Sequence, residues 1–343
     1  FYFTTCGWMM WNWLTSSLAV GATLVLFDGN PFHPHPGALW EMAQDEKITV
    51  FGTSAGYIAA LQNAEVKPGK TYELTRLRAV LSTGSPLSIE GFKFIYEEVK
   101  KDLQLASIAG GTDLNGCFAI GNPMLPVYAG ELQCRPLAMD VRAFDETGSE
   151  LIDEQGELVC CKAFPSMPIY FWDDPDGKKY HNAYFDVYPN VWRHGDFVTV
   201  TRRGGVVMLG RSDATLNPGG VRIGTAEIYR QLEQMTEIAD SVVVGQDWKN
   251  DVRVILFVKL AEGVELTDDL KDRIRQTIRV NASPRHVPAK IISVPDVPYT
   301  LNMKKVELAV KKVIQGHEVL NKDALSNPQA LDYYADIAEL QTD

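Results

Sequence analysis

The sequence has few cysteines and no long apolar run. The five cysteines are scattered and odd in number, which favours reduced thiols over a disulfide framework. Cys160 and Cys161 are adjacent in a predicted strand, so their side chains point to opposite faces and make a poor pair of metal ligands. No apolar segment reaches the length that spans a membrane. These absences argue against a secreted or membrane-spanning protein, and we expect a cytoplasmic one.

Positive charge is also scarce. Lys and Arg total 33 against 44 Asp and Glu, so the net charge of −11 argues against broad electrostatic binding of nucleic acid. The hydrophobic content of 45% is that of a globular protein, and 343 residues suffice for two or three domains. The apolar opening has neither a basic start nor a small-residue cleavage site, so it is a poor signal peptide. Because the chain begins at Phe1 and not at Met, we expect further sequence upstream.

Strands alternate with helices in the first third of the chain. Residues 48–64 predict a strand, a tight loop and a helix, and residues 77–102 repeat that plan, with Ser88 as the helix cap. A further strand then ends in a glycine loop. This alternation predicts an α/β fold with a mainly parallel sheet. Ligands bind such sheets beyond the carboxyl ends of the strands, where residues 82–86 and 109–113 lie.

The predicted secondary structure changes in character twice further along the chain. From about residue 130, short segments joined by Asp, Glu and Gly turns predict a β-rich subdomain that includes a hairpin with a Gly-Gly turn. An α+β segment follows, and over residues 266–278 its apolar residues recur every four positions on one helix face. We expect a large domain over residues 1–212, a small domain over 213–323 and a tail over 324–343.

The first chemical motif is the pattern G-x-S-x-G at residues 52–56. It lies between a predicted strand and a predicted helix, which is the context of a hydrolase nucleophile. Asp113 and then His181 or His194 could complete a triad with Ser54. We favour the simpler interpretation, in which Ser54 caps the helix. Nothing in the sequence singles out one histidine, and the C-terminal third would have no role in a hydrolase.

Two further loops carry oxygen groups. Residues 109–116 contain two adjacent glycines that let a backbone approach a ligand closely, followed by Thr112 and Asp113, whose oxygens suit Mg²⁺ near phosphates. Asp196, just before a predicted hairpin strand, has two acceptor oxygens that can hold a ribose diol. Taken alone, the first loop is equally well explained by a helix cap, and Asp196 is better explained as a turn residue.

The last two motifs lie at a domain border and near the C-terminus. Border glycines can absorb large backbone rotations, and arginines bring bidentate contacts to phosphate. Residues 210–228 combine several glycines with Arg211, Asp213, Arg222 and Glu227. Lys304 could stabilise charge on a carboxylate or phosphate oxygen, although a solvated lysine explains it better when it is taken alone. We expect Lys304 and Lys305 to open the last major helix.

In their order along the chain, these stretches resemble the motifs of the adenylate-forming superfamily, which includes acyl-CoA synthetases, luciferases and adenylation domains. Residues 110–113 resemble its Thr-Glu motif, residues 156–172 its Gly-Glu-Leu segment and residues 193–197 its Gly-Asp motif. Residues 210–228 resemble its hinge motif and residues 298–305 its C-terminal lysine motif. The motifs run through nearly the whole chain, so the resemblance is specific.

Other stretches resemble, more narrowly, the acyl-CoA synthetases that act on acetoacetate. They are Cys6–Leu14, Asp28–Pro34 and the tail Ser326–Gln341, together with residues 110–115 and 298–302 within the motifs above. The resemblance implies that acetoacetate and Mg-ATP form an acetoacetyl-adenylate and pyrophosphate, and that coenzyme A then displaces AMP. Its implied partners are these small molecules, with no nucleic acid and no membrane.

The resemblance also implies roles for individual residues. Those implied to contact the nucleotide are Gly84, Ser85, Pro86, Gly110, Gly111, Thr112, Asp196, Arg211 and Arg222. By the same resemblance, Thr112 and Asp113 would hold a metal ion, and Asp213 would be the hinge. Gly219 and Gly220 would line a coenzyme A tunnel, and Gly7 and Trp8 would border the acyl pocket. Lys304 would serve the adenylation step only.

The sequence departs from the superfamily pattern in three ways. Asp113 replaces the usual glutamate, Met303 replaces the usual glycine, and the loop that grips the outer phosphates would belong upstream of Phe1. We therefore expect this chain alone to be inactive or nearly so. The alternatives are a ligase for another short acid, a serine hydrolase that uses Ser54, and a nucleotide-binding protein without catalytic activity.

Overall fold

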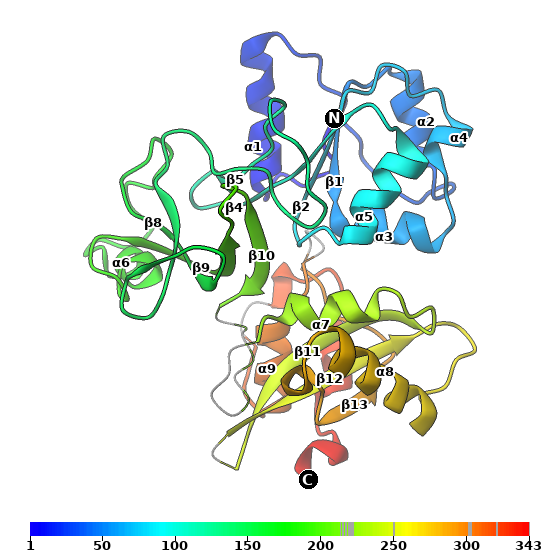
Figure 1. Ribbon diagram of the computed structural model, residues 1–343, viewed down its shortest axis with the longest axis vertical. Helices are drawn as coiled ribbons and strands as arrows, with labels where there is room; N and C mark the ends of the chain where they lie inside the picture. Colours follow the sequence, from blue (N-terminus) through cyan, green and yellow to red (C-terminus); the bar gives the residue numbers. More distant parts are fainter. Residues whose placement is uncertain are drawn as a thin grey trace. The chain divides into compact units, whose positions relative to one another are not determined.

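The protein, represented by a computed structural model, divides into two compact units (Figure 1). Unit 1 comprises Phe1–His194 and Val198–Met208, and unit 2 comprises Gly195–Phe197 and Leu209–Asp343. The residues that the structure describes are 1–212, 214, 216, 218, 223–249, 251–300, 304–319 and 322–342. Each unit has its own hydrophobic core. The boundaries expected from the sequence, at residues 212 and 323, stay a prediction.

A parallel sheet forms the centre of unit 1. Its strands are β1 (Val50–Ser54), β2 (Ala79–Thr83) and β3 (Gln104–Ser107), in the spatial order β1-β2-β3. At the free edge of β1, Tyr2 forms a parallel bridge with Gly52. The alternation of strands and helices thus gives the predicted α/β fold. It brings the carboxyl ends of β1, β2 and β3 to one edge of the sheet.

Side-chain caps start the two helices that follow β1 and β2. The Ser54 hydroxyl accepts a hydrogen bond of 3.1 Å from the Tyr57 amide at the start of α3 (Ala55–Asn63). The Ser88 hydroxyl accepts a bond of the same length from the Gly91 amide at the start of α5 (Ile89–Phe94). Both caps satisfy amides that an isolated helix leaves unpaired. The cap interpretation of the G-x-S-x-G pattern is therefore confirmed.

The remaining helices of unit 1 surround this sheet and its neighbours. They are α1 (Met9–Ser16), η1 (Ser17–Val20), α2 (Ala38–Asp45), α4 (Pro68–Thr71), η2 (Ile95–Val99) and α6 (Lys178–Tyr184). The core on the side of α3 and α5 includes Phe51, Ile58 and Ile95, which are fully buried. A second, smaller core holds Tyr2, Trp8 and Met10.

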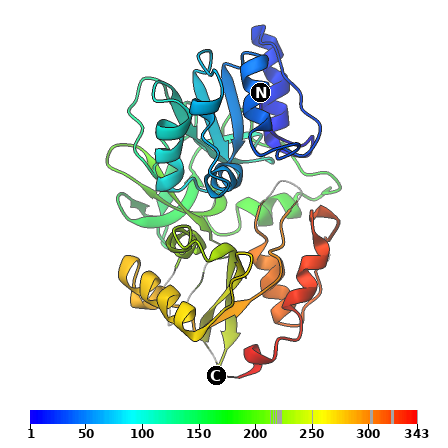
Figure 2. The same ribbon diagram turned by 90° about the vertical axis from the view of Figure 1, so that its right-hand side faces the viewer.

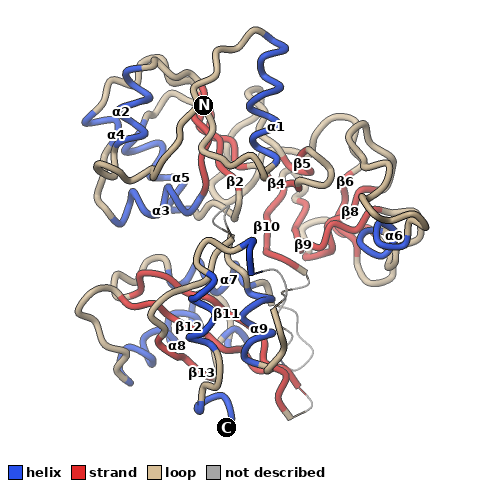
Figure 3. Tube along the Cα trace, turned by 180° about the vertical axis from the view of Figure 1, so that it is seen from behind, coloured by secondary structure: helices blue, strands red, loops and turns tan. Residues whose placement is uncertain are grey.

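Short antiparallel strands make up the β-rich part. The pair β4 (Ala109–Gly111) and β5 (Gly116–Ala119) directly follows β3. A five-stranded sheet has the order β10-β9-β8-β6-β7, formed by β6 (Val141–Phe144), β7 (Glu150–Leu151), β8 (Gln155–Cys160), β9 (Trp192–Val200) and β10 (Val206–Arg211). The predicted hairpin turn is confirmed, because the Thr201 amide donates to the Gly205 carbonyl at 2.9 Å. Helix α6 lies beside β8 and β9 (Figure 3).

Unit 2 is built on a three-stranded sheet buried on both faces. Strands β11 (Ile238–Trp248) and β12 (Asp251–Leu260) are antiparallel, and β13 (Lys290–Ser293) lies parallel to β12. Successive residues of β12 enter different cores, with Leu256 in one and Phe257 in the other. This is the period of two expected for a strand with apolar neighbours on both sides.

One face of this sheet is covered by α7 (Thr225–Leu232) and α8 (Asp268–Asn281) (Figure 2). Thr267 caps α8 by accepting a bond from the Leu270 amide at 3.2 Å. The predicted apolar face of α8 is confirmed, since Leu270, Ile274 and Ile278 are all buried. Leu266 packs against the same core from just before the helix.

The other face is covered by α9 (Glu307–Ile314) and the C-terminal segment. That segment forms the short helices η5 (Lys322–Ala324), η6 (Pro328–Tyr334) and η7 (Ala338–Gln341), and a further turn, η4 (Pro284–His286), precedes β13. Because α9 begins at Glu307, the expectation that Lys304 and Lys305 open this helix is wrong. Within the described ranges, every helix is too short or too polar to cross a bilayer.

Candidate functional site

Glycines at the carboxyl edge of the parallel sheet allow close backbone approaches. Gly84 follows β2 with a φ of +95°, a conformation that favours glycine, and a Cβ atom there would lie 3.7 Å from the Trp8 indole. A Cβ atom at Gly110 would lie 2.0 Å from the Gly116 carbonyl oxygen, so β4 and β5 can pair closely only with glycine. Gly84, predicted to contact the nucleotide, therefore lies beside Trp8, predicted to border the acyl pocket. Gly7 has open space beside it.

Thr112 and Asp113 form an exposed turn between β4 and β5. The turn is closed by the Asn115 amide, which donates to the Thr112 carbonyl at 3.0 Å. The Tyr184 hydroxyl, at the end of α6, donates a hydrogen bond to the Asp113 carboxylate. The Tyr184 ring is itself stacked on Trp192, with ring centroids 3.6 Å apart and planes 14° from parallel. The carboxylate is thus held by a residue that no sequence motif singled out.

His194 packs under this turn. Its ring meets Phe118 edge-on at 4.9 Å between centroids, and a Cβ atom at Gly111 would lie 3.0 Å from its Cε1 atom. The Trp192 indole N–H points to His194 Nδ1 at 3.4 Å. These contacts give His194 a packing role, and glycine at 111 leaves room for the imidazole.

Asp196 and Arg211 come together from adjacent strands. An Arg211 guanidinium nitrogen lies 4.0 Å from an Asp196 carboxylate oxygen, with side-chain exposures of 50% and 15% respectively. The Ser212 amide donates to the Gly195 carbonyl at 2.9 Å, which fixes the two strands at this point. Gly195 has a φ of +83°, and a Cβ atom there would lie 2.9 Å from Arg211. Two residues predicted to hold the nucleotide are therefore neighbours.

Lys304 lies in unit 2, just before Lys305, which forms an antiparallel bridge with Tyr299. The Thr300 amide donates to the Lys304 carbonyl at 2.9 Å, and the Lys304 amide donates to the Thr300 hydroxyl at 3.1 Å. The pKa of Lys304 is lowered, because burial removes water from its ammonium group; Asp196 opposes this shift and Arg211 adds to it. The residue nevertheless retains exposed surface, which a side chain that reaches a bound substrate requires.

Several predicted residues lie outside the described ones: Asp213, Gly219, Gly220, Arg222 and Met303. Glu227, from the same hinge stretch, lies in the first turn of α7. Its carboxylate pairs with His286 Nε2, and His286 Nδ1 lies 2.8 Å from the Ser283 hydroxyl. Glu227 thus links α7 to the segment between α8 and β13.

Among the described residues, the side chains that bind metal ions do not cluster. In the part of the chain that the structure describes, no three His, Cys, Asp or Glu side chains gather closely enough to hold a metal ion. Mg²⁺, however, is commonly held by one carboxylate together with water and substrate phosphates. The exposed oxygens of Thr112 and Asp113 fit that mode of binding.

Comparison with known proteins agrees with this geometry. The sequence profile of the AMP-binding enzymes matches residues 2–170. The acetoacetyl-coenzyme A synthetase of Rhizobium meliloti (strain 1021) is 59% identical over 342 residues, which cover 100% of this chain and 53% of that protein. The chain belongs to the AMP-binding enzyme family. A second member, the acetoacetyl-CoA synthetase of Xenopus tropicalis, is 49% identical over 99% of this chain and 51% of its own length.

Solved structures of AMP-binding enzymes agree in fold. The acetoacetyl-CoA synthetase from Streptomyces lividans superposes with a TM-score of 0.91 at 46% identity, covering 99% of this chain and 53% of that one. The anthranilate CoA ligase AuaEII, at 19% identity and a TM-score of 0.70 over 83% of this chain and 53% of that one, shares the fold alone. The adenylate-forming fold is therefore confirmed. The chain spans about half the length of the curated relatives it matches.

Proposed function

We propose that the protein containing this chain ligates acetoacetate to coenzyme A at the expense of ATP. The observation that carries the proposal is the identity of 59% along the whole chain with an acetoacetyl-coenzyme A synthetase. Seven further acetoacetyl-CoA synthetases, at 45–49% identity, support the same substrate. A ligase for another short acid is the alternative.

The first step would be adenylation. An acetoacetate carboxylate oxygen attacks the α-phosphorus of ATP, and pyrophosphate leaves with the electron pair of the broken P–O bond. Lys304 would stabilise the negative charge that builds up on the reacting oxygens, because an ammonium group in a partly desolvated site interacts strongly with such charge. Asp196 would hold the ribose hydroxyls, with Arg211 beside it. Gly84, Ser85 and Pro86 would border the adenine.

Metal binding is the second part of the proposal. When bound, Mg²⁺ would neutralise charge on the phosphoryl oxygens. The Thr112 hydroxyl and the Asp113 carboxylate would hold it, together with oxygens of the substrate. Tyr184 would keep the shorter aspartate side chain in one orientation, since its hydroxyl donates to that carboxylate.

The second step would form the thioester. The sulfur of coenzyme A attacks the acyl carbon of the adenylate, and AMP leaves with the electron pair of the broken C–O bond. Gly219 and Gly220 would line the coenzyme A tunnel, Arg222 would meet the phosphate and Asp213 would act as the hinge. These four assignments depend on the resemblance of the motif. A cytoplasmic location belongs to the same proposal.

A substrate panel tests the proposed function. Pyrophosphate release by the longest natural polypeptide containing this sequence would be measured with acetoacetate, acetate, propionate and butyrate. We expect kcat/KM for acetoacetate to exceed the others by at least about tenfold, because unpaired polar groups penalise analogues that lack the keto oxygen. Equal rates with several acids would favour the alternative ligase, and esterase activity abolished by Ser54→Ala would favour a hydrolase.

A further inference from the structure

Two adjacent lysines near the C-terminus point in different directions. Lys304 is exposed, whereas the Lys305 side chain is only 24% exposed. Lys305 forms an antiparallel bridge with Tyr299, so the main chain here is extended, and successive side chains in extended chain face opposite sides. The same geometry that directs Lys304 outward therefore directs Lys305 into unit 2.

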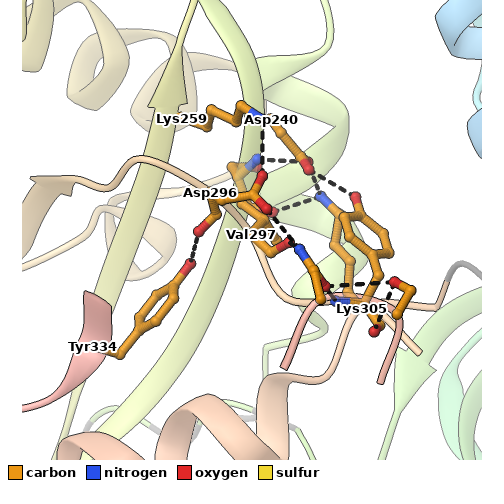
Figure 4. A network of polar contacts seen from close by, with 10 residues as sticks. Asp240, Lys259, Asp296, Val297, Lys305 and Tyr334 are labelled. Atoms are coloured by element: carbon orange, nitrogen blue, oxygen red, sulfur yellow. Dashed lines mark hydrogen bonds and ion pairs between the residues drawn. The ribbon is translucent and has the colours of Figure 1, made fainter. Parts of the chain in front are cut away.

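The inward lysine makes three contacts with unit 2. Its ammonium group lies 2.9 Å from an Asp240 carboxylate oxygen and 2.5 Å from the Ser241 carbonyl oxygen, both on β11. The same ammonium lies 4.2 Å from the ring centroid of Tyr229, on α7. A carboxylate, a carbonyl and an aromatic face together satisfy a partly buried ammonium. Figure 4 shows Lys305 beside Asp240, with dashed lines marking polar contacts.

Asp240 joins both sides of the bridge. One carboxylate oxygen pairs with Lys305, and the other accepts a bond of 2.8 Å from the Tyr299 hydroxyl. Between these two anchored residues, Thr300 and Lys304 pair through the bonds described above. A single carboxylate on β11 thus ties down both chain segments that present Lys304.

A second layer supports the strand that carries Tyr299. The Tyr299 amide donates to the Asn327 side-chain oxygen at 2.8 Å, and the Asn327 amide group donates to Asp296 at 2.6 Å. Lys259 on β12 pairs with the same Asp296 carboxylate at 2.8 Å. The Tyr334 hydroxyl donates to the Asp296 carbonyl at 3.0 Å (Figure 4). The bridge is therefore held from β11, from β12 and from the C-terminal segment.

We propose that Lys305 is a positioning residue for adenylation: its contacts with Asp240 and Tyr229 fix the main chain at Lys304 and thereby aim the Lys304 ammonium. A shift of about 1 Å in a catalytic group can lower a rate about 100-fold, so an anchor one residue away has a large effect. The inference rests on the proposed function, because Lys304 must act in adenylation.

Lys305→Met tests the inference, since methionine is about as long as the apolar stem of lysine and removes the charge that faces Asp240 and the Tyr229 ring. The complete natural polypeptide would be assayed by ATP–pyrophosphate exchange, by thioester formation from supplied acetoacetyl-adenylate, and by amide hydrogen exchange over residues 297–307. We expect kcat for adenylation to fall about 10- to 100-fold with KM for ATP changed less than about threefold. Thioester formation should be unchanged, and the amides should exchange faster.

Two variants complete the design. Lys305→Arg keeps the charge and should restore adenylation to within about threefold of the original. Lys311→Met is the matched control and should change none of the readings, because Lys311 lies on α9, half-buried, and its ammonium group pairs with Asp247 of β11 at 3.2 Å. If Lys305→Met does not fold, Asp240→Asn removes the same charge pair without changing the shape of the side chain.

Normal adenylation by a folded Lys305→Met, or an equal loss of both half-reactions, would overturn the positioning role. The proposed function fails in a different way. If Lys304→Ala adenylates normally while Lys305→Met still speeds amide exchange, then Lys304 has no catalytic role, although the anchor exists. If Lys304→Ala loses adenylation and Lys305→Met does not, only the positioning inference is lost.

Discussion

The Tyr184 hydroxyl donates a hydrogen bond to the Asp113 carboxylate across 71 residues of sequence. Asp113 stands where the superfamily resemblance implies a longer glutamate, so its reach toward a metal ion is shorter by one methylene. The tyrosine restricts this carboxylate to one orientation, and the stack of Tyr184 on Trp192 restricts the tyrosine in turn. We propose that this fixed orientation offsets the shorter reach of the aspartate toward a metal ion.

Tyr184→Phe should weaken this arrangement. The variant keeps the stack on Trp192 and removes only the hydroxyl, which bonds an exposed carboxylate and so contributes modestly. We expect adenylation to slow about 3- to 10-fold and the Mg²⁺ concentration for half-maximal rate to rise. The measurement is a Mg²⁺ titration of pyrophosphate exchange. The control is Tyr180→Phe on the same helix, which removes the hydrogen bond from the Tyr180 hydroxyl to the Pro168 carbonyl. An equal effect of this control would count against the role of Tyr184.

Lys304→Ala should separate the two half-reactions. Removing a group that stabilises developing charge commonly costs about 100-fold or more in rate. We expect that loss in pyrophosphate exchange, with thioester formation from supplied acetoacetyl-adenylate kept within about threefold. If both half-reactions fall together, Lys304 serves the fold or both steps, and the adenylation role is wrong.

The lowered pKa of Lys304 predicts an alkaline limit to adenylation. In the proposed role the charged ammonium is the active form, and burial disfavours it, so the rate should fall as pH rises through a value below the usual lysine pKa of 10.5. The measurement is the pH dependence of kcat for pyrophosphate exchange. In Lys304→Arg, whose guanidinium stays charged, this decline should disappear. A decline that persists there belongs to another group.

Met303→Gly should raise adenylation activity. The superfamily resemblance places glycine before the lysine, and if this position needs a positive φ, methionine there would cost about 1–2 kcal/mol. Relief of that cost predicts an increase of up to about tenfold in pyrophosphate exchange. Met303→Ala separates backbone freedom from loss of the side chain, because alanine shortens the side chain without the freedom of glycine. An unchanged or lower rate in Met303→Gly would mean that methionine fits its backbone conformation.

Ile274→Ala should destabilise unit 2. Ile274 is fully buried between α8 and the sheet, and truncation of such a residue costs about 2–5 kcal/mol. Chemical denaturation followed by circular dichroism measures the change. Asp272→Ala, on the exposed side of the same helix, should stay within about 0.5 kcal/mol, and a similar loss there would show that burial of the Ile274 side chain is not the cause of the effect.

Local features could be predicted from the sequence, because they depend on residues a few positions apart. The caps at Ser54 and Ser88 follow from a short polar side chain before an apolar run, and the buried face of α8 follows from its spacing. Strands and helices in alternation were enough to predict the α/β fold and the edge where Gly84 and Gly110 lie. The order of the motifs carried the resemblance to adenylate-forming enzymes.

The two lysines at 304 and 305 show what local reasoning misses. Their sequence predicts the start of a helix, yet the chain there is extended and α9 begins only at Glu307. Asp240, some 60 residues earlier, outweighs local propensity, because its carboxylate pairs with Lys305 and Tyr299 together.

Composition, spacing and motif order determined the class of fold and the residues to consider. Only the tertiary structure decided which of them are neighbours: Tyr184 with Asp113, Asp196 with Arg211, and Lys305 with Asp240. The physical reason is that helix and strand propensities act over a few residues. Hydrogen bonds and ion pairs between distant residues form only after packing has brought their elements together.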